Sequence, residues 1–321
     1  MKKPWINSII ILCVLLITGY ARLSFEQKLN EEMLELKLIP KSYDMDTRIA
    51  LKQKSFAAGI GSLRPTIAAF MNVSASNDHS KQDWQSLESK FNDIVLLDPH
   101  NPYYWETGSW HLVSNASASS RDDEELPEVT RRKLYRQYIN KGTEFIDRGI
   151  QMNPDSWQIA SLKAKRYANK YRLPDFDKAA DEYLKLSKMP NVPSFRRDLF
   201  KRKALYCLAK VPDKHQEAYD LAYKLYQDPN NRVPSLLNAL WIGQSHPLNK
   251  VKHRYSLLDI YKTQNRAYKW LRVKWIGSIR HKDEAMYGVE KTIRGLEQIL
   301  LIPQPNRVFP TQALKPMFIP K

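Results

Sequence analysis

Residues 154–190 read PDSWQIASLKAKRYANKYRLPDFDKAADEYLKLSKMP, and this stretch decides the fold class. Two runs carry apolar residues at helical spacing, and a proline closes the second run. In that second run Ala179 and Ala180 meet Tyr183 on one helical face. One such helix pair cannot bury its apolar face alone, whereas a stack of pairs can. The stretch therefore predicts an all-α fold of stacked helix pairs.

Proline-bearing turns recur on both sides of this pair. They contain Pro99, Pro154, Pro190 and Pro229, which are 55, 36 and 39 residues apart. Two of these spacings approach the period of about 34 residues that helix–turn–helix repeats show. We attribute the longer one to an insertion at residues 114–127, whose Ser-, Ala- and acid-rich composition predicts that it does not pack. Because proline opens a helix without losing a backbone hydrogen bond, each turn should end one helix and start the next.

The order of these residues resembles the tetratricopeptide repeat (TPR) family, with a small residue in the second helix, then an aromatic residue or Leu, then a closing proline. Ala164 stands where the family has a glycine, and the repeat lengths are irregular. The resemblance covers residues 83–229, and the whole layout is similar to bacterial membrane-anchored TPR proteins of uncertain role. It implies an α-solenoid for protein contacts. The repeat signature comprises Pro99, Trp105, Pro154, Trp157, Tyr167, Ala179, Tyr183, Pro190, Ala218, Ala222 and Pro229.

The amino terminus carries a membrane signal. Lys2 and Lys3 precede a stretch of low polarity that reaches residue 23, close to the roughly 20 residues of a membrane-crossing helix. A cleaved signal peptide has the same pattern, and the small residues Gly19 and Ala21 suit its cleavage site. Since lysines keep the amino end inside, we expect a single-pass membrane protein with a cytoplasmic N-terminus and an exported bulk, either periplasmic or extracytoplasmic. If the signal is cleaved, the chain is secreted.

The rest of the chain divides by composition. We expect a membrane segment at 1–23, a juxtamembrane helical region at 24–81 and a TPR-like array at 82–235. Basic C-terminal helices should follow at 236–302. The last segment, 303–321, contains five prolines and is expected to form an extended tail, either packed along the last helices or free.

Positive charge is concentrated in the later part of the chain. Residues 22–125 carry 16 acidic and 11 basic side chains, whereas residues 126–321 carry 38 basic and 18 acidic ones. Residues 246–282 alone hold ten Lys and Arg against one acid, Asp259, with aromatic residues between them. Two interpretations stay open: a solvated face beside a buried aromatic stripe, or a surface for an anionic partner. The candidate surface comprises Lys250, Lys252, Arg254, Lys262, Arg266, Lys269, Arg272 and Lys274.

We expect residues 255–279 to be helical, and on a helix Leu257 and Leu258, Tyr261, Tyr268, Leu271 and Trp275 would share one face. Lys262, Arg266 and Lys269 would then lie beside that face. A second basic cluster at residues 196–203 precedes an apolar helix, and the same two interpretations apply to it.

Catalytic motifs do not emerge from the sequence. The seven histidines lack the paired spacing of a zinc site, and no phosphate-binding or nucleophile motif occurs. Asp175 and Asp177 imitate an Asp-x-Asp metal motif, but their position after Pro174 predicts a helix cap. We expect Cys207 to pack as a small apolar residue.

The sequence therefore predicts a non-enzymatic, membrane-tethered scaffold without a cofactor, which contacts unknown protein partners in the cell envelope. The alternative is a module that binds an anionic polymer, a lipid headgroup or nucleic acid through the basic helices. Nucleic acid is the less expected partner for an exported chain.

Overall fold

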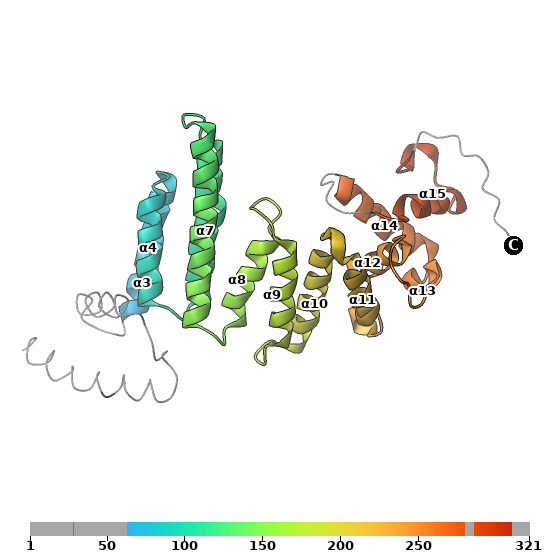
Figure 1. The fold of residues 1–321 in the computed structure, drawn as a ribbon, viewed down its shortest axis with the longest axis horizontal. Helices are drawn as coiled ribbons and strands as arrows, with labels where there is room; N and C mark the ends of the chain where they lie inside the picture. The colour runs from blue at the N-terminus through green and yellow to red at the C-terminus, as the bar shows by residue number, and fades with distance from the viewer. Residues whose placement is uncertain (1–27, 29–62, 280–285, 310–321) are drawn as a thin grey trace, which may run out of the picture. The chain divides into compact units, whose positions relative to one another are not determined.

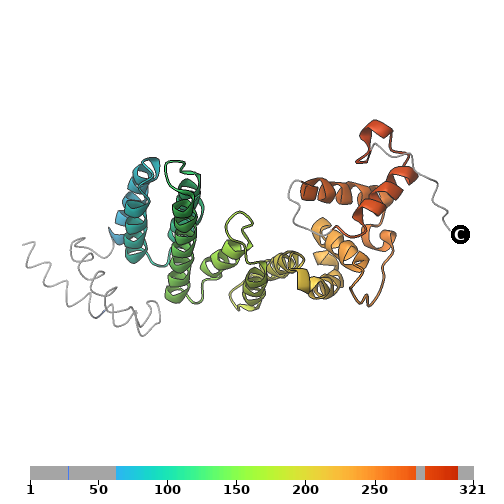
Figure 2. The same cartoon turned by 45° about the horizontal axis from the view of Figure 1, so that its top comes forward.

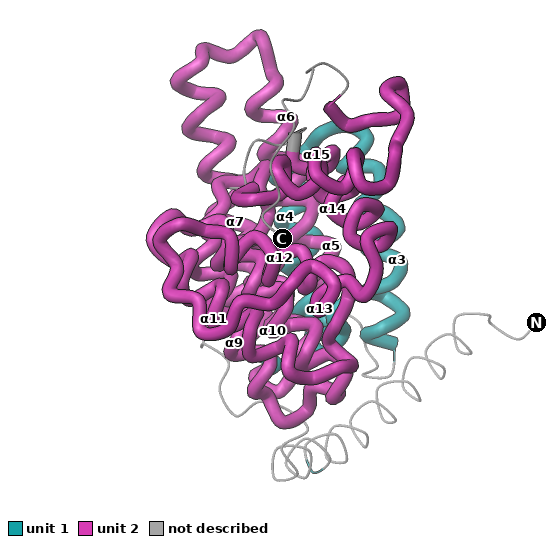
Figure 3. The backbone as a smooth tube through the Cα atoms, turned by 90° about the vertical axis from the view of Figure 1, so that its right-hand side faces the viewer, with its two compact units in different colours: residues 1–104, 151–153 teal, residues 105–150, 154–321 magenta. Residues whose placement is uncertain are grey.

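The computed structural model describes residue 28, residues 63–279 and residues 286–309, and in these ranges every regular element is helical. The predicted all-α class is confirmed for them. The predicted membrane segment 1–23, most of the juxtamembrane region and the end of the tail lie outside the described residues. Within the described ranges, no helix is both long and apolar enough to cross a membrane. The chain divides into two units, residues 1–104 with 151–153, and residues 105–150 with 154–321 (Figure 3).

The first unit contains a helical hairpin. Helices α3 (Arg64–Ser80) and α4 (Trp84–Leu97) pack together, and α4 begins where the Asp83 carboxylate accepts a hydrogen bond from Ser86 N at 3.0 Å. Ala68 and Ala75 are buried on α3, and their small size lets the two backbones approach. On α4 the buried residues are Leu87, Phe91, Ile94, Val95 and Leu97.

The remaining elements follow α4 without a strand among the described residues. The first are α5 (Pro102–Trp110), the π-helix η2 (His111–Ala116), α6 (Ser117–Asp122), α7 (Glu128–Met152) and α8 (Trp157–Ala168). The next are α9 (Phe176–Lys188), α10 (Ser194–Leu208), the 3-10 turn η3 (Pro212–Lys214) and α11 (His215–Tyr226). The last are the 3-10 turn η4 (Pro229–Asn231), α12 (Pro234–Ser245), α13 (Leu257–Tyr261), α14 (Gln264–Ile279), α15 (Val289–Ile299) and the 3-10 turn η5 (Gln304–Asn306).

The predicted unpacked insertion at 114–127 is wrong for most of its length. Residues 114–122 continue the helical run of η2 and α6, and Ala116, Ser117 and Ser120 are buried. Serine can be buried here because its hydroxyl bonds back to the helix, as Ser117 Oγ does to the Val113 carbonyl at 2.5 Å. Only the short connection at 123–127 leaves the helix.

Helices α8 to α12 pack each against the next in chain order (Figure 1). Ala164, Ala180, Ala204 and Ala222 are fully buried along this series, so that the helix backbones can approach closely. One continuous hydrophobic cluster extends from Ala164 to Leu296. The series therefore has a shared core, with no separate small core for each pair.

Each of the four proline-bearing turns separates two helices, as the sequence predicts, but Pro99, Pro154, Pro190 and Pro229 do not themselves open the next α-helix. Pro154 and Pro190 lie in turns, and α8 begins only after Ser156, whose hydroxyl accepts a hydrogen bond from Ile159 N at 3.4 Å. Pro229 opens only the short turn η4. Pro102, the second proline of the first turn, opens α5, Pro234 opens α12, and Pro65 lies in the first turn of α3. A turn of several residues is needed because the chain must reverse before the next helix can pack back.

The last helices also differ from the prediction. Lys262 has φ = 70°, so the run over 255–279 breaks into α13 and α14, and Thr263 Oγ1 caps α14 by accepting from Arg266 N at 3.2 Å. Tyr261, on α13, therefore does not share a helical face with Tyr268 and Trp275, which both lie on α14. Helices α12 to α15 pack around one another, as the orange and red helices in Figure 2 show. The described part of the predicted tail packs on the last helices, which is one of the two expected arrangements, because the ring of Phe309 lies 5.3 Å from that of Trp275.

Candidate functional site

The residues of the candidate anionic-partner surface come from three places. Lys250, Lys252 and Arg254 lie between α12 and α13, Lys262 lies in the break before α14, and the other four lie on α14. All are exposed except Lys274, which is half-buried. The surface is therefore discontinuous in the chain, and no single helix presents it.

Some of these charges already have partners within the protein. Lys252 Nζ lies 3.1 Å from Asp220 Oδ1, and the Arg266 guanidinium lies 4.5 Å from the centre of the Trp270 ring. An exposed ion pair of this kind contributes little to stability, about 0–1 kcal/mol. It does lower the charge that this part of the surface offers to an outside partner.

The second basic cluster, residues 196–203, is bound into the fold. Arg197 donates to the carbonyls of Val192 and Pro190, both at 2.9 Å. Burial lowers the pKa of Lys203, whose ammonium lies 5.4 Å from the centre of the Tyr183 ring. These contacts favour the structural interpretation of the cluster. Of the other members, Arg196 contacts Trp157, Lys201 contacts Asp198 and Arg202 contacts Asn231.

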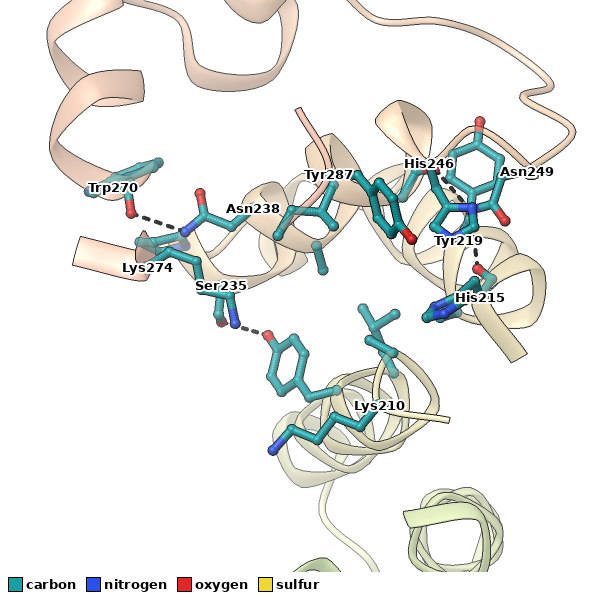
Figure 4. Close-up of a pocket in the computed structure, with 18 of the residues that line it drawn as sticks. Lys210, His215, Tyr219, Ser235, Asn238, His246, Asn249, Trp270, Lys274 and Tyr287 are labelled. Carbon is teal, nitrogen blue, oxygen red and sulfur yellow. Dashed lines mark hydrogen bonds between the residues drawn. The ribbon is translucent and has the colours of Figure 1, made fainter. Parts of the chain in front are cut away.

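Sequence reasoning missed a pocket of about 460 Å³ where α10, α11, α12 and α14 meet (Figure 4). Its lining comes from residues 205–287, so no local motif marks it. Most of the lining is apolar or aromatic: Leu205, Tyr206, Ala209, Ala218, Tyr219, Pro234, Ala239, Ile242, Gly243, Trp270, Val273 and Tyr287. The polar members are Lys210, His215, Ser235, Asn238, His246, Asn249, Lys269 and Lys274.

Two histidines form one side of the pocket. The ring centres of His215 and His246 are 4.5 Å apart, and the Tyr287 ring lies 4.3 Å from that of His246. Burial, and then the neighbouring His215, lower the pKa of His246, so its imidazole is neutral at neutral pH. Its Nδ1 accepts a hydrogen bond from Leu248 N at 3.2 Å, which assigns the ring proton to Nε2. Asn249 supports this side by donating to the carbonyls of His215 and Gly243.

Lys274, Ser235 and Asn238 lie on the opposite side (Figure 4). The Asn238 amide is occupied within the protein, because it donates to Trp270 O at 3.2 Å and accepts from the Tyr261 hydroxyl at 2.9 Å. Ser235 Oγ is 2.5 Å from the Tyr206 hydroxyl, and burial raises the pKa of Tyr206. This side therefore combines fixed, neutral polar groups with a cation.

The lysines of the pocket are not equivalent. The Lys210 ammonium lies 4.7 Å from the centre of the Phe176 ring, so this charge already has an aromatic partner. Lys269 is exposed and Lys274 half-buried, and both come from α14. Among the described residues that line the pocket there is no Asp or Glu. The lining is thus cationic where it is charged.

The residues considered for catalysis have structural roles. Asp175 caps α9 by accepting from Lys178 N at 3.0 Å, which confirms the predicted cap, and Asp177 pairs with Lys214. Burial by itself would raise the pKa of Asp175, but the hydrogen bonds from Lys178 N and from the Lys178 ammonium together outweigh it, so the pKa lies below its ordinary value. Cys207 is buried, as predicted, and burial raises the pKa of its thiol to about 11. In the part of the chain that the structure describes, no three His, Cys, Asp or Glu side chains are placed to hold a metal ion.

The repeat-signature residues divide into a buried and a turn group. Trp105, Ala179, Tyr183, Ala218 and Ala222 are buried, and Trp157 and Tyr167 are half-buried. Tyr183 stacks on Phe200 with ring centres 6.1 Å apart, and Trp105 lies 4.9 Å from Phe145. The signature prolines Pro99, Pro154, Pro190 and Pro229 lie in turns.

Comparison with models of known families, with curated proteins and with solved structures finds no match for this chain.

Proposed function

We propose that this chain is a non-enzymatic scaffold that mediates protein–protein interactions in the cell envelope through a TPR-like α-solenoid. Residues 1–23 tether it to the membrane. The observation that carries the proposal is the series α8 to α12, in which each helix packs on the next and alanines are buried where they pack. Such a series exposes an extended surface whose contacts can be divided among many residues.

Two exposed aromatic side chains on this series support the proposal. Tyr171, between α8 and α9, is 61% exposed, and Phe195, at the start of α10, is 68% exposed. Aromatic residues are enriched in protein–protein interfaces because they provide large contact areas at low entropic cost. Tyr171 lies in the connection before α9 and Phe195 just after the connection that follows α9, so each marks a separate position at which a partner is expected to contact the series.

Site-specific photocrosslinking in intact envelopes tests the scaffold. A photoreactive amino acid replaces Tyr171 or Phe195, and in a matched control it replaces Gln137, an exposed polar residue of α7. We expect a discrete adduct with the same protein from positions 171 and 195, identified by mass spectrometry, and no such adduct from position 137. No adduct at all, or the same adducts from all three positions, would reject this surface.

The tether has a separate test. We expect the full chain to stay in the membrane pellet after an alkaline wash, and a variant that lacks residues 2–23 to leave it. If residues 1–23 are a cleaved signal instead, the full chain becomes soluble and its amino terminus is shortened. Retention of the deletion variant in the washed pellet would contradict both forms of the proposal.

A second candidate function is binding of an anionic polymer, lipid headgroup or nucleic acid by the basic helices. Arg266, Lys269 and Arg272 are exposed and recur every three residues on α14, which places them along one side of the helix. A stripe of this kind attracts a polyanion, and salt weakens the attraction.

Charge reversal tests this candidate. The variant carries Lys262→Glu, Arg266→Glu, Lys269→Glu and Arg272→Glu, and its control carries the same change in charge at the exposed positions Lys133, Arg136, Lys188 and Lys224. Binding to anionic vesicles, heparin and single-stranded DNA is measured at about 50 and about 200 mM salt. We expect salt-sensitive binding that the α14 variant loses and the control retains. Equal loss in both variants indicates net charge alone and rejects the stripe.

A further inference from the structure

The pocket between α10, α11, α12 and α14 has no role in the proposed scaffold. Its volume of about 460 Å³ falls in the range of about 300–1,000 Å³ that small-molecule sites occupy. Ala239, Ile242 and Val273 contribute aliphatic surface, and the rings of Tyr219 and Trp270 contribute aromatic surface. Such a lining takes up an apolar body, because burial there removes apolar surface from water.

The three lysines of the lining give a charged ligand little compensation for lost hydration. The Lys210 ammonium lies 4.7 Å from the centre of the Phe176 ring, and Lys274 also has an interaction within the protein. Lys269 is exposed, so water solvates its ammonium and an ion pair with it would contribute little. An organic cation gains no more, because no Asp or Glu is among the described residues that line the pocket. Since burying an uncompensated charge is costly, the lining favours a neutral ligand.

One buried polar group of the lining can still bind a ligand. His246 is 7% exposed, and its Nδ1 accepts the hydrogen bond from Leu248 N, so the ring proton lies on Nε2. The described residues provide no hydrogen-bond acceptor for this Nε2–H group. The Asn238 and Asn249 amides and the Ser235 hydroxyl, in contrast, are hydrogen-bonded within the protein. A buried donor without an acceptor costs free energy, so a ligand that brings an acceptor to Nε2 is favoured.

We infer that this pocket binds a neutral small molecule that combines an apolar body with a carbonyl-type hydrogen-bond acceptor. The Nε2–H group of His246 donates to the acceptor, and the body packs against Ala239, Ile242 and the aromatic rings. Four helices enclose the site in one concave volume, which suits a free molecule better than the broad surface of about 800 Å² that a stable protein partner covers. The site goes beyond the scaffold function, and neither one requires the other.

Benzophenone and diphenylmethane test the hydrogen bond, because they share the same two rings and only benzophenone carries a carbonyl acceptor. Titration calorimetry measures the binding of each probe to the full chain and to its His246→Asn variant. Both proteins are held at one detergent concentration, so that partition of a probe into detergent cancels between them. We expect His246→Asn to bind benzophenone about three- to tenfold more weakly, because one neutral hydrogen bond is lost. Diphenylmethane should bind within about twofold of its affinity for the wild type.

The two replacements at position 246 keep different halves of the imidazole. The Asn carbonyl can still accept from Leu248 N, but the donor at Nε2 is lost. In His246→Gln the side-chain nitrogen can take the place of Nε2, so this variant should retain most of the affinity for benzophenone. Equal losses for the two probes in His246→Asn, or no saturable binding of benzophenone to the wild type, would overturn the inference.

The neutral class is tested with 4-benzoylbenzamide and 4-benzoylbenzoate, which share the ketone and both rings and differ in charge. Each affinity for the wild type is corrected for the measured partition of the probe into detergent. We expect the amide to bind at least about tenfold more tightly, because the carboxylate loses hydration in the pocket. An acid that binds as tightly as the amide would show that the pocket accepts anions and would reject the neutral class.

A substitution inside the pocket locates the binding. Ala239 lines the pocket on α12, so Ala239→Phe should fill part of the space and weaken benzophenone binding at least about fivefold. The same change at Ala69, an exposed residue of α3, should leave the affinity as in the wild type. Under irradiation the excited ketone takes a hydrogen atom from a nearby C–H group and the two carbons join, so mass spectrometry should find the label within 234–246 or 269–274. An affinity that Ala239→Phe leaves unchanged, or label confined to other segments, would reject this pocket.

Discussion

Gly142 on α7 lies so close to Val113 in the π-helix η2 that a Cβ atom on Gly142 would stand 2.5 Å from Val113 Cγ2. The backbone nitrogen of Val113 would be only 3.2 Å away, so the conflict involves the main chain as well as a side chain. The side chain of Arg172 holds the same segment, since it donates to the carbonyls of Val113 and Ser114. The packing of α7 against η2 therefore depends on the absence of a side chain at position 142.

Gly142→Ala is expected to lower the free energy of unfolding by about 1–3 kcal/mol, the usual cost of overpacking. The gain of up to about 1 kcal/mol from the helix propensity of Ala only partly offsets this cost. The control is Gly295→Ala in α15, where an added Cβ has no neighbour within 4 Å, so the propensity gain should stand alone. Urea denaturation measures both, and a Gly142→Ala variant as stable as the wild type contradicts the contact.

Glu297 should hold the end of the described chain against α14 and α15. Its side chain is 2% exposed, and Oε1 accepts hydrogen bonds from Val308 N at 2.6 Å and from the Tyr268 hydroxyl at 3.2 Å. Hydrogen bonds to a charged group contribute about 1.5–3 kcal/mol, so Glu297→Ala should release residues 303–309 and expose them to protease. Glu128→Ala is the matched control, because Glu128 forms an exposed ion pair with Arg132 on α7, away from this segment. Equal cleavage rates in the two variants would show that Glu297 does not hold residues 303–309 in place.

Cys207 should react with a thiol reagent only when the protein opens. Burial in the core of the helix series hides the thiol and raises its pKa to about 11, so little thiolate exists near neutral pH. We expect iodoacetamide to alkylate Cys207 slowly in the folded protein, and the rate to rise steeply in urea as the structure unfolds. Mass spectrometry measures the rate. An engineered cysteine at the exposed position Ser194 is the control and should react at once. Rapid alkylation of Cys207 without urea would show that the core opens easily.

Stability should fall as the pH drops through about 6.5. Burial and His215 lower the pKa of His246 below its ordinary value of 6.5, while the Tyr287 ring packs against it. Below that pH the unfolded chain binds a proton that the folded chain does not, and this difference favours unfolding. Protonation of Nδ1 would also break the hydrogen bond from Leu248 N.

The measurement is the free energy of unfolding between about pH 5 and about pH 8, the range that brackets the titration of histidine. His246→Asn should flatten the decline at acid pH, since its Oδ1 can still accept from Leu248 N and does not titrate. His79→Asn, at an exposed position, should leave the slope as in the wild type. A slope that His246→Asn does not change would assign the pH dependence to other groups.

Much of the helical framework follows from local sequence. Helical spacing of Ala179, Ala180 and Tyr183 is enough to predict that they share the buried side of one helix, because that periodicity is a property of the helix itself. The Asp175 cap and the burial of Cys207 also follow from nearby residues and residue type. The polar composition of residues 114–127 misled the prediction, since serines that bond to their own backbone can be buried.

Sequence by itself therefore determined the helical class, the positions of the turns and the residue types of the core. Only the tertiary structure decided which basic residues pair inside the protein and which line a pocket. Lys252 forms an ion pair with Asp220 of α11. Lys274 lines a pocket whose other lining residues begin as far back in the sequence as Leu205. The reason is physical: periodicity along one helix fixes which side chains share a face, but the residues opposite that face depend on the packing of helices distant in sequence.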